Sequence, residues 1–329
     1  MNTDAVRRAV STMGSRRVRL AGLAVAIFVA VALSGDVPVQ TVANTPLLHP
    51  FRNATLLVDH NTAAARWQAN NQAPWLDRIT RNPQARWLDE PRDLDAIPDL
   101  ARKAEQSKEL PVLVTYYVPN RDCGGANSGA PTNGDYKAFI DGLVAALGPV
   151  HAAIVVEPDA VAADCFDHNR AALLQETVRR LVAAGQHVYV DAGHPGWRSP
   201  AEMARRLRTA GIAHAEGFSV NVSNRQTTAD CYDWARKISR GVGGRDFVID
   251  TSRNGVGPPV DKNRADGSWC NSTYQGLGED PTTATKRPGL AALLWIKPPG
   301  ETDGQCGGEV DKGFSPDQAS GLIRNAPTR

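Results

Sequence analysis

The sequence predicts an α/β fold built on a parallel sheet. Three observations lead to this prediction. Apolar, β-rich runs alternate along the chain with runs of helical periodicity, an order typical of parallel strands joined by crossover helices. Capping signals mark several of the expected helices. Roughly six to eight such units in one chain of this length favour a barrel, with an open, doubly wound sheet as the alternative.

The expected elements follow one another in regular order. Strands are predicted at residues 111–118, 152–157, 187–191, 217–221, 247–250 and 290–296. Helices are predicted between them at residues 135–147, 169–184, 199–210 and 230–239. The pair Ser199-Pro200 is a helix-opening signal, and Gly185 is a helix-closing one.

The N-terminal region has the pattern of an export signal. Five basic residues precede an uncharged apolar run at residues 20–33: Arg7, Arg8, Arg16, Arg17 and Arg19. That run is shorter than the ~20 residues of a typical membrane span, and a basic start before a short apolar core is the signal-peptide pattern. Residues 1–34 are expected to be a signal peptide or, alternatively, an uncleaved anchor through 20–33. Residues 35–50 are a predicted linker, and 51–329 a single domain. The protein is therefore expected to be secreted.

Composition excludes several classes of partner and cofactor. Lys+Arg total 37 and Asp+Glu total 35, a net charge of only +2, so no nucleic-acid partner is expected and a neutral substrate fits well. Five cysteines allow at most two disulfides and one spare thiol. No CxxC or zinc-like Cys/His spacing is present, so no metal site is expected. No glycine-rich dinucleotide loop follows an early strand, so no cofactor is expected.

Acidic residues follow five of the predicted strands. They are Asp122, Glu157 with Asp159, Asp191, Asp250, and Glu301 with Asp303. The carboxyl ends of parallel strands share one face, where active sites lie. Any single acid at such a position is more often a helix cap. Five in one chain favour a catalytic face, and paired carboxylates are what glycoside hydrolysis requires.

Aromatic residues near these loops support a sugar ligand. Trp67, Trp87, Tyr116, Trp197 and Trp269 all flank polar loop sequence, and an indole face suits the apolar CH face of a sugar ring. The alternative, a place in the core, applies most to Trp87 and to Trp295.

Seven motifs together resemble glycoside hydrolase family 6, the endoglucanases and cellobiohydrolases. They occur in the family's order from about residue 50 to the end of the chain: YYVPNRDCGGANSG (116–129), VVEPDAV (155–161), VYVDAGHPGW (188–197), GFSVNVSN (217–224), FVIDTSRNG (247–255), WCN (269–271) and LLWIKPPGETDGQCGG (293–308). The resemblance implies a distorted, incomplete parallel β/α barrel, with residues 51–329 as its catalytic domain. It also implies an inverting hydrolase of β-1,4-glucan.

Roles for individual residues follow from the resemblance. Asp159 resembles the general acid, Asp122 its pKa-raising neighbour, and Asp303 a proposed base. Tyr116 matches the tyrosine that favours sugar distortion, and Ser128 a serine that positions water. The substrate-binding positions are implied to be Trp67, Asp191, His194, Trp197, Asn221, Trp269, Lys297 and Glu301. The implied disulfides are Cys123–Cys165 and Cys270–Cys306, which leaves Cys231 as the spare thiol.

The family's cleavage mode depends on loop length. Only 23 residues follow Cys306 and the loop after Asp122 is compact, which favours an open cleft and internal cutting over a chain-end cellobiohydrolase. Two segments depart from the family pattern: residues 272–276 after WCN, and 198–200, which lack a second tryptophan. Mixed-linkage β-glucan is the alternative substrate, and a non-catalytic carbohydrate-binding protein is the alternative of another class. A monomer is expected.

Overall fold

The chain forms seven parallel strands that follow one another in sequence order. The computed structural model describes residues 49–124, 129–258, 270–272, 274–304 and 313–328. Within them, each strand pairs only with its neighbours in the chain, so the sheet order is β1 to β7. The strands are β1 (Arg86–Leu88), β2 (Val112–Thr115), β3 (Ala153–Val156), β4 (His187–Asp191), β5 (Gly217–Val220), β6 (Asp246–Asp250) and β7 (Leu290–Leu294).

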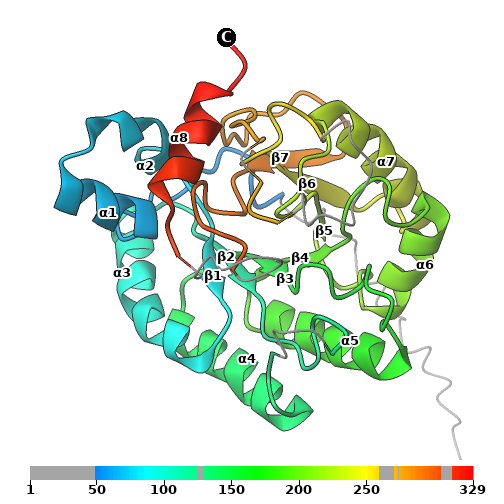
Figure 1. Ribbon diagram of the computed structural model, residues 1–329. Coiled ribbons are helices and arrows are strands. Elements are labelled where there is room, and N and C mark those ends of the chain that lie inside the picture. Colours follow the sequence, from blue (N-terminus) through cyan, green and yellow to red (C-terminus); the bar gives the residue numbers. More distant parts are fainter. Residues whose placement is uncertain (1–48, 125–128, 259–269, 273, 305–312, 329) are drawn as a thin grey trace, which may run out of the picture. The chain divides into compact units, whose positions relative to one another are not determined.

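This order excludes the open, doubly wound alternative, in which the strand order reverses at a switch point. The sheet curls so that its two edge strands approach each other (Figure 1). No β1–β7 ladder forms among the described residues, but the backbone N–H of Ala85 donates to the carbonyl of Trp295 at 3.0 Å. The indole N–H of Trp87 also donates to the carbonyl of Ile296 at 2.7 Å. The predicted distorted, incomplete barrel is confirmed.

Helices cover the outside of the curled sheet (Figure 1). In chain order they are α1 (Ala63–Asn71), η1 (Pro74–Leu76), α2 (Asp77–Thr80), η2 (Pro91–Ala96), α3 (Ile97–Ser107), α4 (Asn133–Leu147), α5 (His168–Ala183), α6 (Pro200–Thr209), α7 (Thr228–Gly241) and α8 (Pro316–Arg324). Helix α6 begins at Pro200, where the Ser199 side chain accepts from the backbone N–H of Glu202, as the sequence predicted. Strand β1 and helices α1, α3 and α8 had no sequence prediction.

Two apolar layers lie on opposite faces of the sheet. On β4, Val188 and Val190 belong to the outer layer, which the helices cover, whereas Tyr189 belongs to the barrel interior. This alternation is the period of two expected of a strand. The ring of Phe51 lies 5.5 Å from that of Tyr189 and helps to fill the interior. The next inward position on β4 is Asp191, so the interior becomes polar toward the carboxyl ends of the strands.

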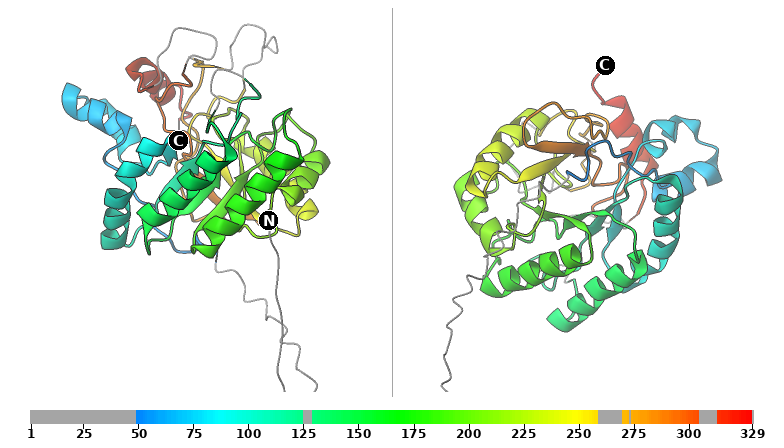
Figure 2. Two further views of the ribbon diagram at one scale, coloured as in Figure 1. Left: turned by 90° about the horizontal axis from the view of Figure 1, so that it is seen from below. Right: turned by 180° about the vertical axis from the view of Figure 1, so that it is seen from behind.

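A third apolar cluster covers the seam between β1 and β7. It contains Leu76 and Ile79 near η1 and α2, Trp295 after β7, and Ala319 and Leu322 from α8. Helices α1 and α8 accordingly lie side by side in all views (Figures 1 and 2). The cluster shields the part of the barrel wall that lacks a continuous strand ladder.

No helix among the described residues is long and apolar enough to cross a membrane. The predicted signal or anchor segment, 1–34, lies outside those residues, as does most of the predicted linker. Export therefore stays a prediction.

Gly217 at the start of β5 provides a test of the interior packing. A Cβ atom there would lie 2.0 Å from the backbone oxygen of Asp246 on β6 and 3.1 Å from the ring of Tyr189. We expect Gly217→Ala to lower the free energy of unfolding by about 2 kcal/mol or more, measured by urea denaturation. Gly134→Ala is the matched control, because its Cβ would meet only Thr132 Oγ1 at 3.4 Å. Equal effects of the two variants would contradict this account.

Candidate active site

The strand-end loops bring four of the predicted acids into one electrostatic group. Asp159, after β3, is partly buried and is acted on by the charges of Asp191, Asp122 and Asp303. Asp122, Asp159 and Asp303 lie in the loops after β2, β3 and β7, and Asp191 is the last residue of β4. The convergence that the sequence predicted for the carboxyl ends of the strands is therefore present.

Asp159 stands at the centre of this group. Its backbone adopts φ +71°, a left-handed conformation that residues other than glycine rarely adopt. Residues in this conformation are often found at functional sites. Its backbone N–H donates to Asp191 Oδ2 at 2.9 Å. Burial, followed by the charges of Asp191 and Asp122, raises the pKa of Asp159 to about 8. The carboxyl group is therefore protonated at neutral pH and can donate a proton.

Asp191 lies beneath Asp159 and is held by three donors. Besides the N–H of Asp159, Oδ2 accepts from Gly193 N–H at 2.8 Å, and Oδ1 accepts from the Ser219 hydroxyl at 2.8 Å. Burial raises its pKa to about 6, although these hydrogen bonds oppose the rise. Gly193 has φ +71°, and a Cβ there would lie 2.9 Å from that of Ala162. Glycine therefore lets this loop pass close to the one that carries Asp159.

Tyr116 and Asp122 form a second pair. The Tyr116 hydroxyl donates to Asp122 Oδ1 at 3.3 Å. Burial, and then the charges of Asp159 and Asp122, raises the pKa of Tyr116, so the phenol stays a neutral donor. The Arg121 guanidinium lies 4.2 Å from the Tyr116 ring centroid and donates to the Tyr116 carbonyl. The Trp87 ring meets the same tyrosine edge-on at 5.2 Å.

The loop that carries Asp122 is tied to the loop after Asp159. Cys123 and Cys165 form a disulfide, the first of the two implied pairs. Arg170 on α5 adds hydrogen bonds to the carbonyls of Pro119 and Asn120. Both Asn120 and Cys123 have positive φ, 53° and 55°, so these cross-links hold a backbone that would otherwise relax.

Asp303 has the opposite electrostatic environment from Asp159. Arg253 Nη1 contacts both of its oxygens, at 2.9 and 3.0 Å, and the backbone N–H of Asn271 donates to Oδ2 at 3.1 Å. Lys297 Nζ lies 3.7 Å from Oδ1. Burial opposes ionisation, but the charges of Arg253 and Lys297 and these hydrogen bonds lower the pKa of Asp303 to about 2. The site thus pairs a protonated acid with a fixed carboxylate.

Comparison with known proteins identifies the family. The model of glycosyl hydrolases family 6 matches residues 50–327. The chain belongs to this family. It is 36% identical over 271 residues to Endoglucanase A of Cellulomonas fimi, covering 79% of this chain but only 58% of that protein. It is also 36% identical over 324 residues to Endoglucanase A of Thermobispora bispora, covering 92% of this chain and 69% of that protein.

A solved relative supports the fold as well. The endoglucanase Cel6 of Mycobacterium tuberculosis, in complex with methyl-cellobiosyl-4-deoxy-4-thio-β-D-cellobioside, superposes with a TM-score of 0.78 at 40% identity. The match covers 84% of this chain and 99% of that one. The resemblance that the seven motifs carried is confirmed at the level of the family.

Two acids of this family 6 site serve the backbone instead of facing the reaction. Glu157 Oε2 accepts from the N–H groups of Tyr117 and Val118, both at 2.9 Å. Asp250 accepts from four backbone N–H groups: Ser223, Ser252, Ile296 and Lys297. Burial raises the pKa of both carboxyls. Glu157 and Asp250 therefore have a structural role, because each accepts hydrogen bonds from backbone N–H groups of the loops.

The proposed sugar-contacting residues fall into two groups. Lys297 lies beside Asp303 and its charge also acts on Glu301, while its Nζ is 5.5 Å from the Trp87 ring centroid. Trp197 is partly buried, with its ring 5.4 Å from that of His194. By contrast, the Asn221 side chain is fully buried and bonds the backbone of Gln226 and Asp250. These contacts make Asn221 a residue that holds its loop rather than one exposed to a sugar.

The structure gives two tryptophans surroundings that the sequence did not predict. Trp67 lies on α1 against Trp75 and Phe314, outside the group of acids. Trp87, for which a core position was considered, contacts Tyr116 and lies under Lys297. The signal that could have identified it is the adjacent Leu88-Asp89, an apolar residue followed by an acid, as after the other strands. Ser128, Trp269 and Cys306 lie outside the described residues, so the Cys270–Cys306 bridge stays a prediction.

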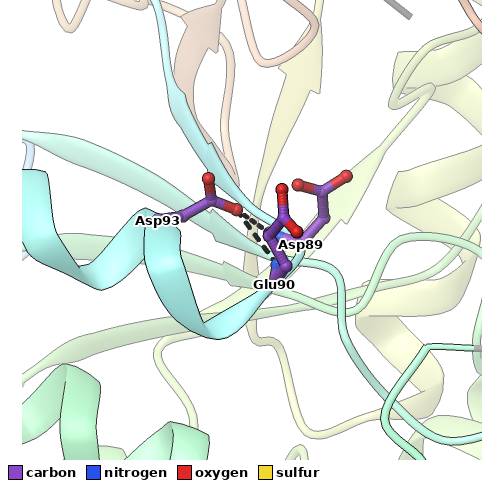
Figure 3. Close-up of side chains that lie close together, drawn as sticks. All are labelled: Asp89, Glu90 and Asp93. Atoms are coloured by element: carbon purple, nitrogen blue, oxygen red, sulfur yellow. Dashed lines mark hydrogen bonds between the residues drawn. The ribbon is translucent and has the colours of Figure 1, made fainter.

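One acidic cluster near β1 has the spacing of metal ligands. Carboxylate oxygens of Asp89, Glu90 and Asp93 lie within 4.8 Å of one another. The carboxylate of Asp93 points back to the chain and accepts the backbone N–H groups of Asp89 and Glu90, at 2.9 and 3.0 Å (Figure 3). With Glu90 it forms a capping box at the start of η2. The cluster is thus explained as a helix start.

Because Asp159 and Asp303 have opposite electrostatic environments, we expect their replacement by asparagine to change the stability of the fold in opposite directions. An unfolded aspartate loses its proton near pH 4, whereas Asp159 retains its proton to about pH 8. Stability attributable to Asp159 therefore falls as pH rises between these values. Asp159→Asn removes this cost, and we expect it to stabilise the fold by ~1 kcal/mol or more at pH 8 and by less at pH 5.

Asp303→Asn is the matched comparison. Its depressed pKa contributes stability above pH 4 that is lost as pH falls toward 2. The variant should therefore be less stable than the unaltered protein at pH 8. Urea denaturation of all three proteins at pH 5 and 8 measures the differences. Destabilisation by Asp159→Asn that is equal at both pH values would contradict the raised pKa.

Proposed function

We propose that this chain is a secreted, inverting endo-β-1,4-glucanase. The observation that carries the proposal is the difference in pKa between two partly buried carboxyl groups in one site, about 8 for Asp159 and about 2 for Asp303. Glycoside hydrolysis needs a protonated carboxyl to expel the leaving oxygen and an ionised one to assist on the other side of the sugar.

Asp159 is the proposed general acid. Its proton passes to the glycosidic oxygen as the C–O bond breaks, and Asp159 is left as a carboxylate. Burial and the neighbouring charges of Asp191 and Asp122 disfavour that carboxylate, so Asp159 keeps its proton at neutral pH and has it available for transfer. Tyr116, held by Arg121 and Asp122, is proposed to crowd the sugar at the cleavage point and favour its distortion.

Asp303 is better suited to stabilise positive charge than to accept a proton. Both of its oxygens are bonded to Arg253, and a carboxylate with a pKa of about 2 is a weak base. We therefore assign it the electrostatic stabilisation of the oxocarbenium-like transition state. The proton of the attacking water is assigned to Asp122, through a second water. Inversion itself is supported by the family's pattern.

The substrate class is supported by the relatives and by the residues around the acids. The two curated relatives are named endoglucanases, and the solved relative was bound to a thio-linked cello-oligosaccharide. Aromatic faces at Trp87, Tyr116 and Trp197 suit the apolar faces of glucose units. A net charge of +2 over the full chain suits a neutral polymer. Internal cutting is supported by the names of those relatives and by the small number of residues between β2 and α4.

Secretion is supported by two features. Residues 1–34 have the basic and then apolar pattern of a signal peptide. The Cys123–Cys165 disulfide beside the site requires an oxidising compartment to persist.

Hydrolysis of soluble carboxymethyl-cellulose tests the proposal. We expect viscosity to fall steeply while few new reducing ends appear, because an internal cut halves chain length at the cost of one bond. Freshly released ends should be α-anomers by NMR, the outcome of inversion. Viscosity that falls only in proportion to reducing ends would indicate chain-end cutting, and activity confined to mixed-linkage glucan would change the substrate.

Asp159→Asn is the control for the assigned chemistry. It should abolish cleavage of the polymer yet retain measurable hydrolysis of a dinitrophenyl β-cellobioside, whose leaving group needs no proton. Equal loss on both substrates would count against Asp159 as the acid.

A further inference from the structure

A second aromatic surface lies outside the group of acids, on α1 and η1. Trp75 is 41% exposed, and of the tryptophans that the structure describes it alone is classed as exposed. Around it, Asn70, Asn71, Gln72 and Pro74 are also exposed. We call these five residues the Trp75 patch.

The Trp75 patch itself carries no charged side chain. Residues 67–76 contain no acidic or basic side chain, although 22% of the whole chain is charged. Amide side chains both donate and accept hydrogen bonds, which suits sugar hydroxyls, and an amide costs less to desolvate than a charge. An exposed indole flanked by amides therefore matches a neutral polysaccharide better than a charged partner.

The ring is held in place from below. Trp75 meets Trp67 edge-on at 6.2 Å, and the Trp67 ring lies 5.7 Å from that of Phe314. Trp67 and Phe314 in turn pack against the third apolar cluster, which includes Leu76 and Leu322. An indole supported in this way loses little conformational freedom on binding, which favours its use as a platform.

The same contacts connect the patch to the catalytic loop. Phe314 pairs with Glu301 in an antiparallel bridge, and Thr302 N–H donates to the Gly313 carbonyl at 2.8 Å. Gly300 has φ +87°, and a Cβ there would lie 2.6 Å from the Phe314 ring. The segment that bears Glu301 and Asp303 is thus packed directly on the aromatic support of Trp75, as the adjacent positions of α1 and α8 indicate (Figures 1 and 2).

We infer that the Trp75 patch is a glucan-binding platform outside the catalytic site, which holds insoluble β-glucan against the enzyme. The inference rests on the proposed function, because it takes the same polymer as its ligand. A short oligosaccharide occupies only the site with the acids, whereas a polymer surface contacts the patch as well. The platform therefore matters for adsorption to solid substrate and not for turnover of short soluble chains.

Adsorption of the full chain to microcrystalline cellulose tests the inference. The measurement uses the Asp159→Asn background, so that the solid is not consumed. Trp75→Leu keeps an apolar side chain but removes the aromatic face, and we expect it to lower the partition coefficient about fivefold. Trp75→Tyr, which restores an aromatic face, should recover most of the binding. Val256→Ala removes a different exposed apolar side chain (44% exposed) and should leave adsorption unchanged.

A second measurement separates platform loss from misfolding. With Asp159 intact, Trp75→Leu should hydrolyse cellotetraose with unchanged kcat/KM. The inference is overturned if Trp75→Leu adsorbs like the parent protein, if Val256→Ala loses as much, or if sedimentation shows that Trp75 instead holds two copies of the chain together. Failure of the proposed function is a distinct result: the unaltered protein would hydrolyse no soluble β-glucan, whatever the adsorption data.

Discussion

The contact between Asp159 and Asp191 is the constraint on which the site depends. Asp191 accepts the backbone N–H of Asp159, and that hydrogen bond fixes the loop in its positive-φ conformation. Burial, and then the negative charge of the same carboxylate, raises the pKa of Asp159. One interaction thus fixes the position of the acid and contributes to its protonation state. The strand ends of β3, β4 and β5 are needed to build it, because Ser219 supplies a further donor.

The number of hydrogen-bond donors distinguishes Asp159 from the other acids at the strand ends. Asp250 accepts four backbone N–H groups and Asp191 three donors in all. No described residue donates to the Asp159 carboxyl. Each donor favours the ionised form of the acid that accepts it. The least supported acid therefore keeps its proton, and it is the one in the position to protonate a substrate. Asp303 is the contrasting case, because its ion pair with Arg253 lowers its pKa and keeps it ionised.

Much of this arrangement could be predicted from the sequence, because it follows from short-range patterns. Each of the six predicted strands overlaps an observed one, and the acids that follow them do converge. Strand β1 escaped prediction because it has three residues, Arg86–Leu88, and no apolar run. Two features depended on tertiary geometry. The local pattern of Glu157 and Asp250 resembles that of Asp159, and only the folded loops show which acid accepts backbone N–H groups. Likewise, only the near-closure of β1 on β7 shows that Trp87, and not Trp67, lies beside Tyr116.

The most direct test of this account is the titration of the Asp159 carboxyl itself. Protein labelled with ¹³C at aspartate carboxyls would be followed by NMR, with the Asp159 resonance assigned by its absence from Asp159→Asn. The account predicts a midpoint at about pH 8 that moves clearly lower in Asp191→Asn, because the neighbouring negative charge is gone. A midpoint near 4 in the unaltered protein, or one that Asp191→Asn leaves in place, would contradict it.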